Sequence, residues 1–190
     1  MRKIGFIIII AILFFGVGST CKPEPTDYLA EAWSLFEAGN YAEARTNFNS
    51  AVTEQPEKAA EAYAGLGWCD LLEDNLTSAY NNFSSSINTE NLLDANAGAA
   101  LASSELERYS EAIDFANTVL NANPGYSFSH YTSVDATVLR LTKAKSAAAL
   151  GDFDTALDEI QEIDPDFDAN PGTPDGQADI LAKIEELISG

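Results

Sequence analysis

The sequence predicts an all-α protein in which similar pairs of helices follow one another as an array. A recurring pattern ends at Ala44, Ala79, Ala112 and Ala156, which lie 35, 33 and 44 residues apart. A polar turn precedes each of these alanines. The composition, with 46% hydrophobic and 10% aromatic residues, is that of a globular chain rather than a disordered one.

Each copy of the pattern runs from a small residue through a helix and a polar turn to an aromatic residue or Leu, and then to the alanine. Gly39 and Gly151 stand where a helix must end, and polar residues such as Asn40 begin the next helix. The small residues let two helices cross closely, and a bulky residue one turn after the alanine fills the notch between neighbours. The opening small residues are Ala32, Gly67, Ala100 and Ala144, and the notch positions hold Phe48, Phe83, Ala116 and Ile160.

On these residues the chain resembles the tetratricopeptide repeat, a helix-turn-helix unit of about 34 residues. The resemblance implies a right-handed α-solenoid of about 3.5–4 repeats with a C-terminal capping helix. We expect repeats over residues 28–58, 60–92, 93–125 and 134–166 within a helical domain, and a capping helix over 177–188 with one apolar face.

The first twenty residues have the composition of a signal peptide. Two basic residues precede an apolar run from residue 4 to residue 17, which is too short to span a bilayer comfortably. The small residues that follow lead to Cys21, and this ending resembles the lipobox of bacterial lipoproteins. Gly18 and Thr20 depart from the residues usual in that motif.

We expect residues 1–20 to be a signal peptide and residues 21–27 to be a tether lipidated at Cys21, which anchors the domain at the outer membrane facing the periplasm. Cleavage by the ordinary signal peptidase remains open, and would give a soluble periplasmic or secreted protein. An uncleaved anchor is the third alternative. Cys69 lies among apolar residues, so we expect a buried, inert thiol.

The charge of the chain is strongly negative. All thirty acidic residues follow residue 20, and eight of the ten basic residues accompany them. Such a surface repels phosphate backbones and anionic headgroups, so we expect no nucleic-acid partner, and membrane contact through the lipid anchor only. The acidity serves solubility, or attracts a basic partner.

The resemblance places a partner-binding groove on the concave face lined by the first helix of each repeat. We expect a protein or peptide partner, basic or apolar, with two tryptophans as aromatic anchors. In the alternative interpretation, the indoles only cover the inner helices or pack against the N-terminal segment. The candidate groove residues are Leu29, Trp33, Phe36, Trp68, Leu71, Leu72, Leu101 and Lys145, with Leu141 nearby.

The longest interval between repeats contains an aromatic insertion with Tyr126, Phe128, His130 and Tyr131. Two interpretations are open. Long loops in compact domains are often functional, which favours a recognition loop. The aromatic side chains also favour simple packing over the edge of repeat three.

An acidic segment after the fourth repeat has some features of a calcium-binding loop. Asp164, Asp166, Asp168 and Asp175 fall at ligand positions of an EF-hand. Ala169 replaces the required glycine, however, and three prolines stiffen the segment. We therefore predict no metal and a polar connector, with a calcium site as the weaker alternative.

Little in the sequence points to catalysis. His130 is the only histidine, and no phosphate-binding glycine loop is present. We predict no enzyme activity and no cofactor. The leading hypothesis is a protein-interaction scaffold of the cell envelope. The alternatives are a structural subunit of an envelope assembly that docks through its convex face, and a ligand- or cation-binding module.

Overall fold

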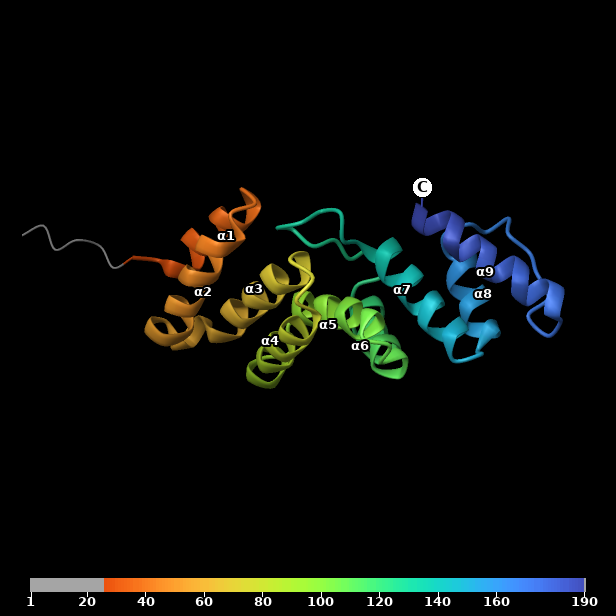
Figure 1. Cartoon of the computed structure of the whole chain (residues 1–190), viewed down its shortest axis with the longest axis horizontal. Helices are drawn as coiled ribbons and strands as arrows, with labels where there is room; N and C mark the ends of the chain where they lie inside the picture. The colour runs from red at the N-terminus through yellow and green to blue at the C-terminus, as the bar shows by residue number, and fades with distance from the viewer. Residues whose placement is uncertain (1–25, 190) are drawn as a thin grey trace, which may run out of the picture.

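The computed structural model describes residues 26–189, which form an elongated array of helices (Figure 1). The predicted signal peptide and Cys21 lie outside the described residues. The four helix pairs are α1 (Tyr28–Glu37) with α2 (Tyr41–Glu54), α3 (Ala59–Leu72) with α4 (Leu76–Thr89), α5 (Leu93–Glu105) with α6 (Tyr109–Ala122), and α7 (Ala136–Ala149) with α8 (Phe153–Gln161). A 3-10 turn, η1 (Pro56–Lys58), joins the first two pairs, and α9 (Pro174–Ser189) closes the array.

The predicted all-α solenoid is confirmed. Over residues 26–189 the only β-type pairing is an isolated bridge between Ser127 and Asp135. The first helices contact one another along the array, α1 with α3, α3 with α5, and α5 with α7, and each second helix packs against the first helix of the next pair. None of the helices in this range is both long and apolar enough to cross a membrane.

The turn inside each pair has the same backbone geometry in all four copies. A residue with positive φ lies five positions before each pattern alanine, and the next amide donates to a carbonyl five residues earlier, at 2.8–2.9 Å. These two features define a Schellman cap, which satisfies carbonyls at the end of the first helix. The positive-φ residues are Gly39 (77°), Asp74 (62°), Glu107 (59°) and Gly151 (80°).

The notch between repeats is filled as the sequence predicts. A Cβ added to Gly65 would lie 2.2 Å from Phe48 Cζ. A Cβ on Gly67 would lie 2.6 Å from the Phe83 ring, and one on Gly98 would lie 2.1 Å from Phe83 Cζ. Both phenylalanines are fully buried. The absence of side chains at these glycines therefore lets each ring enter the neighbouring helix pair.

The capping helix begins at Pro174, three residues before the predicted start at residue 177. The Thr173 hydroxyl accepts a hydrogen bond from Gly176 N at 3.2 Å, so Thr173 acts as the N-terminal cap. Ile180 and Ile184 are buried against α7 and α8, whereas Leu181 and Ile188 remain exposed. The helix covers the end of the array and still presents apolar side chains to solvent.

Candidate functional site

The aromatic insertion forms a short hairpin over residues 126–136, which we name the insertion hairpin. Phe128 N donates to Val134 O at 2.9 Å, and Ala136 N donates to Tyr126 O at 2.8 Å. The hairpin leaves the chain between α6 and α7 and reaches back toward α1 on the side lined by the first helices (Figure 1). It covers the part of the groove formed by repeats one and two.

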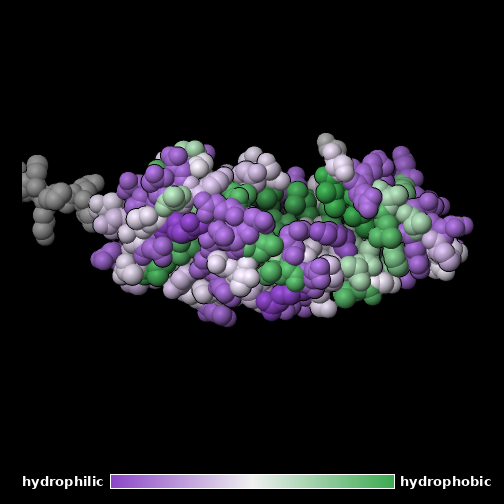
Figure 2. Space-filling view, in the orientation of Figure 1, coloured by the Kyte–Doolittle hydropathy of each residue, from purple (hydrophilic) through white to green (hydrophobic). Residues whose placement is uncertain are grey.

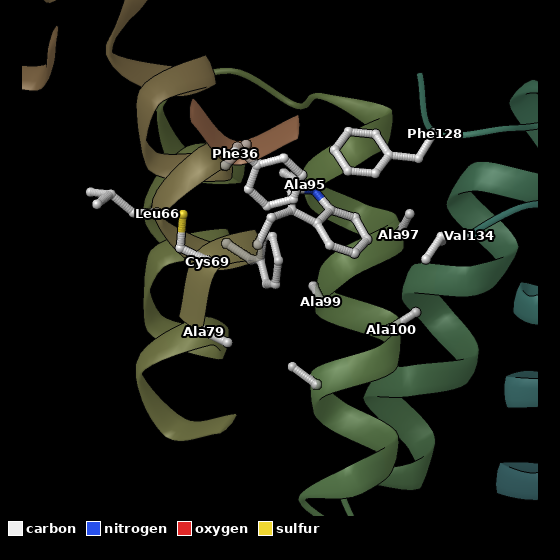
Figure 3. Packing of buried hydrophobic residues seen from close by; sticks show 14 of the residues in the cluster. Phe36, Leu66, Cys69, Ala79, Ala95, Ala97, Ala99, Ala100, Phe128 and Val134 are labelled. Atoms are coloured by element: carbon white, nitrogen blue, oxygen red, sulfur yellow. The ribbon is translucent and has the colours of Figure 1, made fainter. Parts of the chain in front are cut away.

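Phe128 and Trp68 form the centre of this contact. Their rings are stacked, with centroids 4.4 Å apart and planes 18° apart, and both side chains are fully buried. Figure 3 shows the Phe128 ring reaching from the hairpin toward Phe36 and the small residues of α5. Aromatic pairs of this kind stabilise by about 0.5–1.5 kcal/mol beyond the burial of their area.

The hairpin tip rests on the second tryptophan. The imidazole of His130 lies flat on the indole of Trp33, with centroids 4.0 Å apart and planes 5° apart. His130 Nδ1 lies 2.7 Å from Glu37 Oε1. Trp33 is also supported by Phe48, whose ring meets it edge-on at 4.8 Å. The tip therefore touches α1 of the first repeat, although the hairpin begins after α6 of the third.

The base of the hairpin is held by a buried polar contact. The Tyr126 hydroxyl donates to Asp94 Oδ1 at 2.7 Å, and burial together with this carboxylate raises the pKa of Tyr126. Asp135 then caps α7 by accepting from Val138 N at 3.1 Å. The hairpin is fixed at its base more firmly than at its tip.

These contacts correct two sequence-based expectations. The insertion is not confined to the edge of repeat three: Tyr126 contacts Asp94 there, whereas Phe128 and His130 extend over the tryptophans of repeats two and one. Of the predicted anchors, Trp68 is covered and only Trp33 is half-buried. Leu29 and Phe36 are likewise buried in the core, whereas Leu71 and Leu72 are half-buried against it.

The groove stays open in its second half, between α5, α7 and the end of α9. A cavity of about 300 Å³ lies there. Of the predicted groove residues, the structure brings Leu101, Lys145 and the nearby Leu141 into it. Apolar surface gathers beside α7 and α9 in Figure 2, within a largely hydrophilic exterior. The cavity is lined by Leu101, Ser104, Glu105, Val138, Leu141, Thr142, Lys145, Leu187 and Ile188.

Several of these lining residues were not predicted from the sequence. Val138 and Thr142 share a face of α7 with the predicted Lys145, and this helical spacing was a usable signal. Leu187 and Ile188 come from the capping helix, whose position depends on tertiary packing. The only charged residues on the cavity wall are Lys145 and Glu105, which form an ion pair at 2.7 Å.

The acidic segment after α8 is not assembled as a cation site. Asp164 pairs with Lys183 Nζ at 2.9 Å, and Asp175 lies in the first turn of α9. Asp166 and Asp168 are exposed. Within residues 26–189 no three His, Cys, Asp or Glu side chains converge as metal ligands would. Asp164 and Lys183 instead attach the connector to the cap.

Solved structures that share this fold include tetratricopeptide repeat proteins. One from Parabacteroides merdae ATCC 43184 superposes with a TM-score of 0.58 and 15% identity over 85% of this chain. The chain spans 59% of that protein, which is less than two thirds of its length.

MamA AMB-1 gives a TM-score of 0.63 with 16% identity, covering 84% of this chain and 96% of that one. A thermophilic repeat protein from Thermus thermophilus gives 0.56 with 20% identity, covering 85% and 80%. No protein-family model and no curated protein matches the sequence. At these identities the similarity shows the fold, a tetratricopeptide-type solenoid, and the site must be interpreted from its own residues.

Proposed function

We propose that this chain is a non-catalytic protein-interaction scaffold of the cell envelope, which holds a partner segment in the open half of its concave groove. The observation that carries the proposal is the cavity between α5, α7 and α9. Its volume of about 300 Å³ is large enough for one or two apolar side chains of a partner.

The cavity has the composition of an interface core. Leu101, Val138 and Leu187 are half-buried, so each has apolar area left to bury, and Ile188 at the rim is 57% exposed. An exposed apolar surface with a polar rim is typical of an interaction site on a soluble domain. Lys145 and Glu105 pair with each other at the cavity wall, and each can instead contact polar groups of a partner.

The envelope part of the proposal rests on the leader sequence. A signal peptide before Cys21 would export the domain, and a lipid on that cysteine would tether it through residues 21–27. The strongly acidic surface suits a domain that is held at a membrane by its anchor and does not itself bind anionic headgroups.

Site-specific photo-crosslinking in intact cells tests the groove. A photoreactive residue at Val138, on the cavity wall, should capture a defined partner, and one at the exposed Asn81 of α4, on the opposite side of the repeats, should not. Ile188→Glu should abolish the product at Val138. Leu181→Glu, on the same helix but outside the cavity, should leave it unchanged. Capture at Asn81 alone would show that the partner binds the convex face instead.

A second experiment tests the anchor. Metabolic labelling with a fatty acid should mark the unmodified chain, and Cys21→Ser should abolish the label and release the protein from the membrane fraction. An unlabelled chain that fractionates with soluble proteins would contradict the tether. It would leave the groove proposal standing, since the groove experiment does not use the anchor.

A further inference from the structure

The insertion hairpin lies in the first half of the groove, whereas the cavity between α5, α7 and α9 lies in the second half. The hairpin contacts its half as a bound ligand would. Its buried rings alternate with exposed residues. Tyr126 is 4% exposed, Phe128 is fully buried and His130 stacks on Trp33, whereas Ser127 and Ser129 face solvent. This period of two is the pattern by which an extended segment presents one side to a surface.

The hairpin is attached to the groove by side chains only. Every backbone hydrogen bond described for its residues stays within the hairpin or joins it to Asn123 or to the first turn of α7. The contacts with α1, α3 and α5 include the ring stacks on Trp33 and Trp68, the edge-on contacts of Phe128 with α1, and the polar contacts to Glu37 and Asp94. Another segment with the same ring spacing could therefore make the same contacts.

The hairpin also fits its surface incompletely. A cavity of about 220 Å³ remains beside the tip, and Trp33, Glu61, Asp94 and His130 are among its walls. The tip's polar contact is largely accessible to water, since the His130 and Glu37 side chains are 27% and 53% exposed. A screened pair of this kind contributes little, about 0–1 kcal/mol. A larger ring at the tip would fill space that the imidazole leaves empty.

We propose that the insertion hairpin is an intramolecular ligand of the first half of the groove, and that the surface beneath it binds in trans a partner segment with aromatic rings at alternate positions. The carboxylates of Glu61 and Asp94 beside the tip favour a basic residue next to the ring. This surface is distinct from the cavity between α5, α7 and α9, so its test is independent of that site.

The test uses a ring-free hairpin and a synthetic peptide. The variant Tyr126→Ser/Phe128→Ser/His130→Ser keeps the length of the hairpin and removes the three rings that contact the groove. The probe is a fluorescein-labelled peptide with the sequence of residues 124–136. The variant should bind it at least about tenfold more tightly than the unmodified chain, in which the hairpin competes.

Two controls define the chemistry. A peptide with Phe128→Leu and His130→Leu should bind the variant about tenfold more weakly, because the ring stacks are lost. Adding Trp33→Ala to the variant should weaken binding of the original peptide to a similar degree. Equal affinity for the leucine peptide, or no effect of Trp33→Ala, would overturn the assignment of an aromatic surface.

Three results would overturn the intramolecular assignment. One is a variant with unchanged helical circular dichroism that does not bind the peptide. Another is an unmodified chain that binds it equally well. The third is a dimer of the unmodified chain with exchanged hairpins. If the ring-free variant loses its helices, a milder double variant, His130→Ala/Glu37→Ala, frees only the tip of the hairpin. The probe is then the same peptide with His130→Trp. The milder variant must bind this peptide more tightly than the unmodified chain does.

Discussion

The flat stack of His130 on Trp33, with ring centroids 4.0 Å apart, joins the insertion hairpin to the first repeat across the groove. It is the outermost of the ring contacts that fold the insertion hairpin over its own repeats. Trp33 and Trp68 are the chain's only tryptophans, and both touch the hairpin, so intrinsic fluorescence reports directly on whether it is in place.

His130→Ala should lower the free energy of unfolding by about 1 kcal/mol, since it removes one ring stack and one exposed polar contact with Glu37. Tryptophan emission should shift to the red as Trp33 gains water. The matched control is Tyr131→Ala, a hairpin residue 37% exposed, which should change stability by less than about 0.5 kcal/mol. Denaturant titration followed by fluorescence measures both. Equal effects would mean that the tip does not rest on Trp33 in solution.

Gly98 and Phe83 make a second close contact, and Gly98→Ala should be destabilising. The added methyl would meet the fully buried Phe83 ring, and overpacking of this kind costs about 1–3 kcal/mol. Thermal and denaturant unfolding measure the loss. Adding Phe83→Leu should recover part of the loss, because a smaller side chain makes room for the methyl group. The double variant should therefore lose less free energy of unfolding than the two single variants lose in sum. Additive effects would contradict the proposed contact.

The repeat pattern could be predicted from the sequence because it depends on local spacing. Small residues at the crossings and Phe48 or Phe83 at the notches repeat at nearly constant intervals, and the structure places them as the pattern requires. The turns were only partly predictable. Gly39 and Gly151 indicate a left-handed cap, whereas Asp74 and Glu107 adopt the same backbone without the usual residue.

The candidate site was harder to predict, because its form depends on contacts between distant residues. Trp68 and Phe128 are sixty residues apart, and nothing in either segment shows that one covers the other. Leu187 reaches the cavity only because the capping helix packs on α7. Leu101 and Lys145 were found since they follow the repeat spacing. The tertiary placement of an insertion and a cap decides which half of the groove stays open.

The left-handed turn at Glu107 predicts a stabilising substitution. A side chain in this conformation costs about 1–2 kcal/mol, which glycine avoids at a smaller cost in chain entropy. Glu107→Gly should therefore raise the free energy of unfolding by about 0.5–1 kcal/mol. Asp114→Gly, at an exposed position inside α6, should lower it by about 1 kcal/mol. Denaturant titration measures both, and a loss at Glu107 would contradict the described turn.

Burial makes Cys69 a poor nucleophile. Desolvation raises the pKa of its thiol to about 12, so only about one thiol in ten thousand is ionised at pH 8. Iodoacetamide should leave Cys69 unmodified in the folded protein and alkylate it rapidly in guanidinium chloride, as followed by mass spectrometry of the peptide that contains it. Rapid alkylation without denaturant would show that the α3 core opens readily.

The contact between Asp27 and Lys58 predicts a pH dependence of stability. Lys58 Nζ lies 2.8 Å from the Asp27 carboxylate, and this contact, with the Ala30 amide, lowers the pKa of Asp27. A lowered pKa in the folded state means that the carboxylate stabilises the fold above its unfolded pKa, and that this contribution is lost as the pH falls through the folded pKa.

Asp27→Asn keeps a capping side chain but removes the charge, so it should lower the melting temperature near neutral pH. The difference from the unmodified chain should shrink steadily below about pH 4, where Asp in the unfolded chain begins to protonate. Glu57→Gln, an exposed carboxylate one residue from Lys58, should show no such trend. Melting curves between neutral pH and about pH 2.5 cover this window, and a constant difference would show that the Asp27 contact is not formed.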